Sequence, residues 1–251
     1  MTWDPSCYGA HADHRLRPGL ELLARIPIEP TMIYDLGCGT GELTNYLGSR
    51  WPEATVVGID NSQEMLDRAR PQNNVTFVRQ SIEDWKPPAA PDLIFSNAAL
   101  HWVEDHDSLF PRLFGELKTG GALAVQMPDN WDAPTHLLTD QEIDRRGWTK
   151  RLDGHLPRRP VAAIDQYIAW LAGAKDVDAW RTTYFQPMSG TDPVLSWVRG
   201  TVLVPIRTAL AEAEFQSLET SLAEQYRLAY PPLPNGITIM PMSRIFLLAT
   251  K

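Results

Sequence analysis

Short, strongly apolar runs alternate with amphipathic segments along the first half of this 251-residue chain. Each run is too continuously apolar to leave one face in water, so it predicts a buried strand. The predicted strands are 31–36, 54–60, 75–78, 92–96 and 122–127, and the predicted helices are 42–50, 62–70 and 108–117, with Ser62 as an N-cap. Strands that alternate with helices predict an α/β fold, in which helices cover both faces of a parallel sheet.

The pattern changes after residue 128. From there to 178, prolines and charged residues recur without a clear strand, which predicts a helical insertion over the ligand-binding end of the sheet. Two more strands are predicted at 179–186 and 237–250. An apolar stripe at helical spacing between them predicts a long amphipathic helix whose stripe is in the core. The stripe consists of Phe215, Leu218, Leu222, Tyr226 and Ala229.

Composition narrows the class of protein. An apolar fraction of 43% and a charged fraction of 22% are typical of a globular chain with a sizeable core. The formal charge of -8 argues against nucleic acid and anionic membranes as partners, because affinity for phosphate comes chiefly from Lys and Arg. Cys7 and Cys38 are too few for a disulfide framework. With no signal peptide and no long apolar span, we expect a cytoplasmic protein.

The first chemical signal is the segment DLGCGTG, residues 35–41. Its glycines follow a predicted strand and open a predicted helix, where glycine lets the backbone turn sharply and approach a ligand. Glu42 stands where a dinucleotide-binding loop has its closing glycine, and a carboxylate there would repel a pyrophosphate. The loop therefore favours a ligand without phosphate.

S-adenosylmethionine (SAM) is such a ligand, because its methionine end is a zwitterion. Its ammonium group can meet the carboxylate of Asp35. Asp60 ends the second predicted strand, about 20 residues after the glycines, where it can accept hydrogen bonds from both ribose hydroxyls. Met65 is expected to lie against the adenine. Together these residues predict a SAM-binding site.

DLGCGTG, the strand end GID at 58–60 and FSNAALHW at 95–102 resemble motifs of class I SAM-dependent methyltransferases. The resemblance implies a Rossmann-like, mostly parallel sheet of seven strands with the last strand antiparallel, helices on both faces and a helical lid. It also implies that the loop after the third strand flanks adenine. Ser81 stands there where many relatives have Asp, so Glu83 or Asp84 is the expected substitute. The residues expected to bind SAM are Asp35, Gly37, Gly39, Gly41, Asp60, Asn61, Met65, Ser81, Ile82, Asn97 and Trp102.

A more specific resemblance extends over almost the whole chain. VQMPDN at 125–130 and WRTTY at 180–184 are unusual strings that resemble the trans-aconitate 2-methyltransferase family, as do WDP at 3–5 and RIF at 244–246. That family transfers a methyl group to a carboxylate oxygen of a tricarboxylic acid. The resemblance thus implies a small polycarboxylate substrate, foremost trans-aconitate, with a monomethyl ester and S-adenosylhomocysteine (SAH) as products.

The chemistry fits these residues. A carboxylate is already an anionic nucleophile at neutral pH, so no general base is needed and the site must only position the reactants. A cation on the reacting oxygen would weaken its attack, so arginines should bind the carboxylates that do not react. His101 is expected to face the transferred methyl group. The substrate-binding candidates are Tyr8, His11, Arg181, Tyr184, Trp197 and Arg244.

Alternatives remain at this stage. A methyltransferase for a phenol or an activated carbon would need a base such as His101. An NAD-dependent oxidoreductase is disfavoured by Glu42, and a non-catalytic SAM sensor would lack turnover. DNA methylation is disfavoured because NAAL at 97–100 lacks the Pro-Pro-aromatic motif of amino-methylating enzymes. His11 and His14 have no evident third ligand, so no metal is expected.

We expect the chain to divide into four parts. Residues 1–30 are expected to form an N-terminal helical lid segment, 31–127 the SAM-binding core, 128–178 the helical insertion, and 179–251 the rest of the sheet with helices on the substrate side. One departure from the family pattern lies in the last part, where Val204 replaces an arginine of the relatives. The oligomeric state is left open by the sequence.

Overall fold

The structure is a computed structural model that describes residues 16–153, 155 and 161–251. The described residues divide into two compact units. Unit 1 takes its residues from Met1–Pro128, Val161–Thr182 and Arg244–Lys251, and unit 2 takes its residues from Asp129–Pro160 and Thr183–Ser243. Tyr8 and His11, two of the predicted substrate-binding residues, lie outside the described residues.

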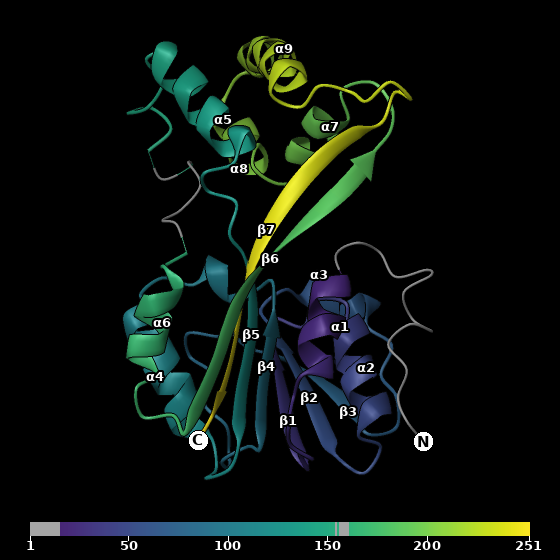
Figure 1. Cartoon of the computed structure of the whole chain (residues 1–251), viewed down its shortest axis with the longest axis vertical. Coiled ribbons are helices and arrows are strands. Elements are labelled where there is room, and N and C mark those ends of the chain that lie inside the picture. Colours follow the sequence, from purple (N-terminus) through teal and green to yellow (C-terminus); the bar gives the residue numbers. More distant parts are fainter. Residues whose placement is uncertain (1–15, 154, 156–160) are drawn as a thin grey trace. The chain divides into compact units, whose positions relative to one another are not determined.

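A sheet with the strand order β3-β2-β1-β4-β5-β7-β6 organises the fold (Figure 1). β1 to β5 pair in parallel, whereas β7 pairs antiparallel with β5, so the predicted seven-stranded sheet with an antiparallel last strand is confirmed. The strand predicted at 179–186 is longer than expected at both ends. The strands are β1 (Met32–Leu36), β2 (Thr55–Asp60), β3 (Val75–Arg79), β4 (Leu93–Asn97), β5 (Ala122–Pro128), β6 (Asp176–Met188) and β7 (Thr238–Thr250).

Helices cover both faces of the sheet in unit 1, with α1, α2 and α3 on one side and α4 and α6 on the other (Figure 1). The predicted N-cap is confirmed, because the Ser62 side chain accepts a hydrogen bond from the Met65 N–H at 3.3 Å. The helix predicted at 62–70 ends early, since Ala69 is already extended two residues before Pro71. The helices are α1 (Arg17–Ala24), α2 (Glu42–Arg50), α3 (Gln63–Arg68), α4 (His106–Glu116), α6 (Ile164–Trp170) and the 3-10 helix η2 (Leu100–Trp102).

The two faces of β5 meet different surroundings. Leu123, Val125 and Met127 belong to the hydrophobic core that contains the buried side chains of α4. Because successive side chains of a strand point to opposite faces, Ala124 and Gln126 lie on the face that carries α1. The same alternation holds in β7, so the predicted binding residue Arg244 can be assigned to one face of the sheet.

Unit 2 contains α5 (Pro134–Arg145), α7 (Pro193–Arg199), α8 (Val204–Ala209) and α9 (Glu212–Ala229). The apolar stripe predicted on α9 is buried at Phe215, Leu218, Leu222 and Tyr226, where it packs in a separate core. Ala229 is exposed, so its assignment to the core was wrong; the helix ends there and the chain no longer follows the stripe. α5 packs on α9, and the hydroxyls of Thr139 and Tyr226 share a hydrogen bond of 2.6 Å.

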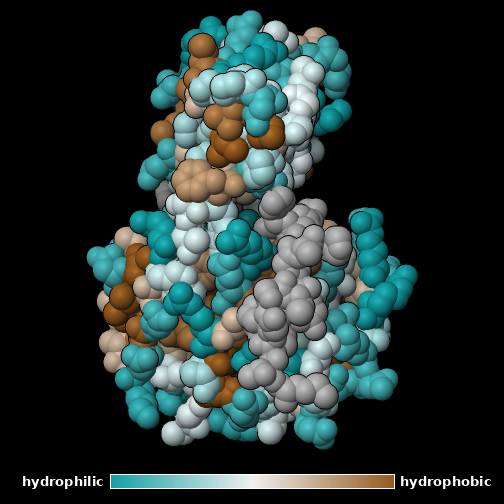
Figure 2. All heavy atoms as spheres, turned by 45° about the vertical axis from the view of Figure 1, so that its right-hand side comes forward, coloured by the Kyte–Doolittle hydropathy of each residue, from teal (hydrophilic) through white to brown (hydrophobic). Residues whose placement is uncertain are grey.

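The visible surface is mostly hydrophilic, with apolar side chains scattered among polar ones (Figure 2). Large exposed apolar side chains, such as Phe185 and Leu228, belong to different elements. None of the helices in the described part of the chain is long and apolar enough to cross a membrane.

Candidate functional site

The glycine loop between β1 and α2 has three residues with positive φ: Gly37 at 76°, Gly39 at 56° and Gly41 at 78°. A Cβ on Gly37 would lie 2.1 Å from the Ala99 Cβ, and one on Gly41 would lie 2.3 Å from the Phe77 ring, so both positions are filled by the protein itself. A Cβ on Gly39 would have no atom within 4 Å. The open space beside Gly39 is where a ligand can approach the backbone.

The end of β2 holds this loop in place. The N–H groups of Gly37 and Cys38 donate to the Ile59 carbonyl at 2.8 and 3.0 Å. Asp60 accepts from the Gly39 N–H at 2.8 Å with Oδ2 and from the Ser62 N–H at 2.9 Å with Oδ1. Each carboxylate oxygen has a further lone pair, so Asp60 can fix the loop and still accept hydrogen bonds from ribose hydroxyls.

Asp35, the predicted partner of the SAM ammonium group, is buried at the end of β1. Its Oδ2 accepts a hydrogen bond of 2.7 Å from the Thr44 hydroxyl on α2. Burial raises the pKa of Asp35 to about 7, and the nearby charge of Asp60 adds to the rise, while the Thr44 hydrogen bond opposes it. A ligand cation beside Asp35 would favour its ionised form.

The expected adenine side is formed by segments after β2 and β3. The Ile82 side chain lies against the glycine loop, 3.7 Å from where a Cβ of Gly37 would be. The Ser81 hydroxyl donates to Asp84 at 2.9 Å and accepts from the Asp84 N–H at 3.2 Å. The residue that departs from the family pattern is thus bonded to one of its two expected substitutes. Asn61 and Met65 are exposed beside this region, at the end of β2 and on α3.

Asn97 is the last residue of β4, and the segment that follows contains His101 and Trp102 in η2. It turns at Ala98, which has a φ of 53°, and His106 anchors it, with its Nε2 2.9 Å from the Leu100 carbonyl. Trp102 is 65% exposed, with its ring centroid 4.7 Å from that of His101.

His101 is poorly suited to act as a base. Its Nδ1 is buried without a hydrogen-bond partner in the described part of the chain. Burial lowers the pKa of His101 to about 4, with smaller contributions from the charges of Arg244 and His106. The imidazole is therefore neutral at physiological pH.

The substrate-binding candidates that the structure describes belong to different units. Arg181 and Arg244 are in unit 1, where Arg181 is exposed on β6 and Arg244 is 8% exposed on β7. Tyr184 and Trp197 are in unit 2 and pack against its core. Val204, at the start of α8 in unit 2, is 49% exposed.

The structure adds one residue that the sequence analysis did not single out. Gln126 on β5 is completely buried, and Arg244 Nη1 donates to its Oε1 at 3.3 Å. The signal in the sequence was a polar residue inside the otherwise apolar strand 122–127.

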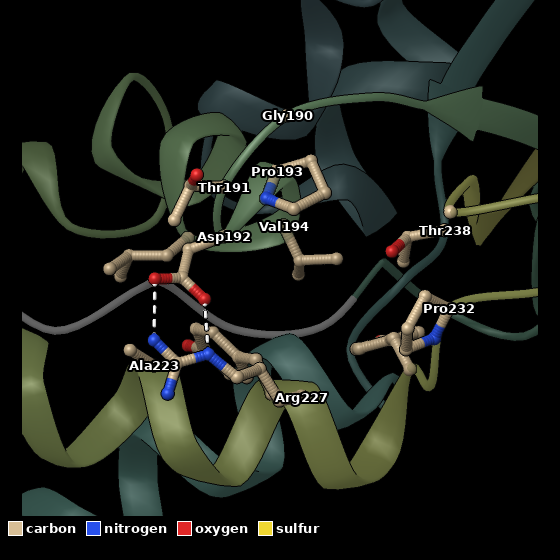
Figure 3. A pocket seen from close by; sticks show the side chains of 13 residues that line it. Gly190, Thr191, Asp192, Pro193, Val194, Ala223, Arg227, Pro232 and Thr238 are labelled. Atoms are coloured by element: carbon tan, nitrogen blue, oxygen red, sulfur yellow. Dashed lines mark hydrogen bonds and ion pairs between the residues drawn. The ribbon is translucent and has the colours of Figure 1, made fainter.

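A cavity of about 320 Å³ lies in unit 2, and none of the residues predicted to bind SAM or substrate is among those that line it. Asp192 and Arg227 form a bidentate ion pair at this cavity, with N···O distances of 2.5 and 2.7 Å (Figure 3). Apolar side chains such as those of Val194 and Pro232 line much of the rest. Within the described residues there is no group of three His, Cys, Asp or Glu side chains that could hold a metal ion.

Comparison with known proteins extends these observations. The model of a methyltransferase domain family matches residues 33–121. The trans-aconitate 2-methyltransferase of Rhodococcus jostii is 42% identical over 98% of this chain and 98% of its own length. That of Azoarcus is 40% identical over 100% and 99%, and that of Mycobacterium tuberculosis is 39% identical over 98% and 96%.

Solved structures support the fold. The YcgJ protein of Bacillus subtilis has a TM-score of 0.60 at 17% identity, with 95% of this chain and 99% of that chain covered. Phosphoethanolamine N-methyltransferase 2 of Haemonchus contortus, in complex with S-adenosyl-L-methionine, has a TM-score of 0.53 at 16% identity, with 93% and 52% covered.

Alanine substitution at the two glycines should separate folding from ligand binding. Gly39→Ala adds a methyl group only to open space, so we expect a stability loss of about 1–2 kcal/mol from its positive φ and SAH binding at least tenfold weaker. Gly37→Ala also forces its Cβ into Ala99, so it should lose about 2–5 kcal/mol. Gly147→Ala is the control, because it has a φ of 70°, open surroundings and a place in unit 2. Denaturant unfolding and titration calorimetry measure both effects, and unchanged SAH affinity in Gly39→Ala would contradict the assignment.

The pKa of Asp35 predicts how SAH binding depends on pH. With a pKa near 7 the carboxyl is about 10% ionised at pH 6 and about 90% at pH 8, so affinity should rise about ninefold between them if the ligand ammonium contacts Asp35. Asp35→Asn should flatten this rise, and the exposed Glu53→Gln should leave it intact. Calorimetry at both pH values tests the contact, and a rise that persists in Asp35→Asn would assign it to another group.

Proposed function

This chain belongs to the trans-aconitate 2-methyltransferase family of SAM-dependent methyltransferases, and we propose that it esterifies one carboxylate of trans-aconitate to the monomethyl ester. The observation that carries the proposal is the length of the similarity to relatives of that name. It extends over 98% of the chain and thus through unit 2, whereas the general methyltransferase domain match ends at residue 121.

In the proposed reaction, SAM supplies a methyl group bound to a positively charged sulfur. The glycine loop and Asp60 hold the ribose side, and Asp35 holds the ammonium group. Gly39 leaves room for the ligand, since no protein atom lies within 4 Å of the position its Cβ would take. These residues position the methyl group and take no part in bond making.

The charges of the reactants favour a carboxylate acceptor in this environment. The carboxylate oxygen would attack the methyl carbon while the bond from that carbon to the sulfonium sulfur breaks, which leaves SAH as a neutral thioether. Opposite charges are thus neutralised in the transition state, and a site shielded from water favours the reaction. The carboxylate is already ionised at neutral pH and needs no base. The neutral, half-buried His101 suits this chemistry, because a base with a pKa of about 4 would be inefficient at deprotonating a phenol.

The substrate assignment is tested by offering SAM with trans-aconitate, cis-aconitate, isopropylmalate and citrate in parallel. We expect trans-aconitate to give a product heavier by one CH2, with an equal amount of SAH, and to have the highest kcat/KM of the four. Mass spectrometry and SAH quantification measure both products. Ester formation from another acid alone would move the assignment to that acid, and no ester from any would remove the substrate proposal while leaving the fold and cofactor in place.

Replacement of His101 tests the chemistry independently of the substrate panel. If the acceptor is a carboxylate, His101→Ala should lower kcat by about tenfold or less, because no proton must be removed. A catalytic base would give a loss of about 100- to 10,000-fold. The exposed His155→Ala is the matched control and should leave kcat unchanged. A loss of several orders in His101→Ala alone would favour a phenol or carbon acceptor.

A further inference from the structure

A row of polar side chains, three of them buried and Asn97 half-buried, crosses one face of the sheet in unit 1. β1 and β4 pair Asp35 with Phe95, and β4 and β5 pair Asn97 with Gln126. β5 and β7 pair Gln126 with Phe246, two residues from Arg244. In-register neighbours and residues two apart share a face, so the polar members of the row lie on the side that carries α1. These members are Asp35, Asn97, Gln126 and Arg244.

Gln126 has a fixed orientation in this row. Its Oε1 accepts from Arg244, and arginine has only donors, so the amide oxygen must face Arg244 and the NH2 group must face away. That Nε2 is buried and has no hydrogen-bond partner among the described residues. A donor that is buried without a partner destabilises a protein, so the bond from Arg244 explains the amide oxygen but leaves the buried NH2 group as an uncompensated cost.

Two other polar atoms near Gln126 are also buried without a hydrogen-bond partner among the described residues. Asn97 Oδ1, on the paired residue of β4, is buried without a partner within the described part of the chain, as is His101 Nδ1 in η2, which packs against β5. The charge of Arg244 contributes to the lowered pKa of His101, and its guanidinium donates a hydrogen bond to Gln126. Arg244 therefore interacts with both His101 and Gln126. Several unpartnered polar atoms in one place point to a polar ligand that would satisfy them.

The order of the strands places Gln126 between the cofactor loop and the arginine. Neighbouring strands lie about 4.8 Å apart, so β5 is about 10 Å from β1, which leads into the glycine loop, and β7 is about 14 Å from it. A substrate carboxylate near Gln126 is thus closer to the expected position of the methyl donor than one held by Arg244.

We propose, on the basis of the function proposed above, that Gln126 is a substrate-positioning residue whose Nε2 donates a hydrogen bond to the carboxylate that receives the methyl group. Arg244 holds the Gln126 amide in orientation and binds a carboxylate that does not react. A neutral donor suits the reacting oxygen, because it fixes its direction without the strong charge pairing that would reduce its nucleophilicity. His101, which is neutral, likewise adds no positive charge that would pair with the reacting oxygen.

Two variants of Gln126 separate this role from a purely structural one. Gln126→Met removes the donor and leaves the charge of Arg244, whereas Gln126→Glu keeps an acceptor for Arg244 and replaces the NH2 donor by a carboxylate oxygen. We expect kcat/KM for trans-aconitate to fall about 10- to 100-fold in Gln126→Met and further in Gln126→Glu, where the new oxygen repels the substrate. In Gln126→Glu, lower pH should restore part of the activity as the carboxyl becomes protonated.

Titration calorimetry with SAH establishes that each variant is folded, with an affinity within threefold of the wild type. Gln216→Met, an exposed glutamine on α9, is the matched control and should keep full activity. If Gln126 only holds Arg244, Gln126→Glu should keep near-normal activity, which would overturn the proposal, as would Gln126→Met within threefold of the wild type. If the wild-type enzyme gives no ester at all, the proposed function fails and this role fails with it.

Discussion

The parallel, in-register pairing of β1, β4 and β5 is the constraint on which the candidate site depends. It fixes which side chains share a face, and so brings Asp35, Asn97 and Gln126, which are far apart in sequence, into one row. The antiparallel pairing of β7 adds Arg244 to the same row. A register shift of one residue in β5 would turn Gln126 into the apolar core with α4 and replace it by Val125.

Burial at Asp35, a member of this row, and at His101 on η2 shifts the two pKa values in opposite directions but has the same effect on charge. It raises the pKa of Asp35 and lowers that of His101, so both groups are pushed towards their neutral forms. For Asp35 the balance is close enough to neutrality for a ligand cation to restore the charge. His101 is held neutral far more firmly. The site thus combines one carboxylate that can respond to a cation with an imidazole that does not add positive charge near the acceptor.

Much of the fold could be predicted from the sequence, because continuous apolar runs and helical spacing report burial directly. The sheet strands are of this kind, whereas the Ser62 cap could be predicted from the preference for serine at the start of a helix. The bond from Ser81 to Asp84 could not be predicted, since both residues had other plausible partners and only the loop conformation decides between them. The assignment of Ala229 to the core was wrong because the helical spacing of apolar residues continues to the point where the helix ends. The division of the chain into two units that share β6 and β7 also leaves no periodic signal.

Gln126 shows why a site is harder to predict than a fold. In the sequence it is one polar residue in an apolar strand, which could equally be bonded inside the core. Its meaning depends on two facts of the three-dimensional structure: Arg244 occupies its oxygen, and its nitrogen has no partner among the described residues. Patterns of hydrophobicity encode where a side chain is buried, but the pairing of its donors and acceptors depends on residues from other strands. A buried polar atom that the fold leaves unpaired therefore indicates a ligand site, but it can be recognised only once the register of the strands is known.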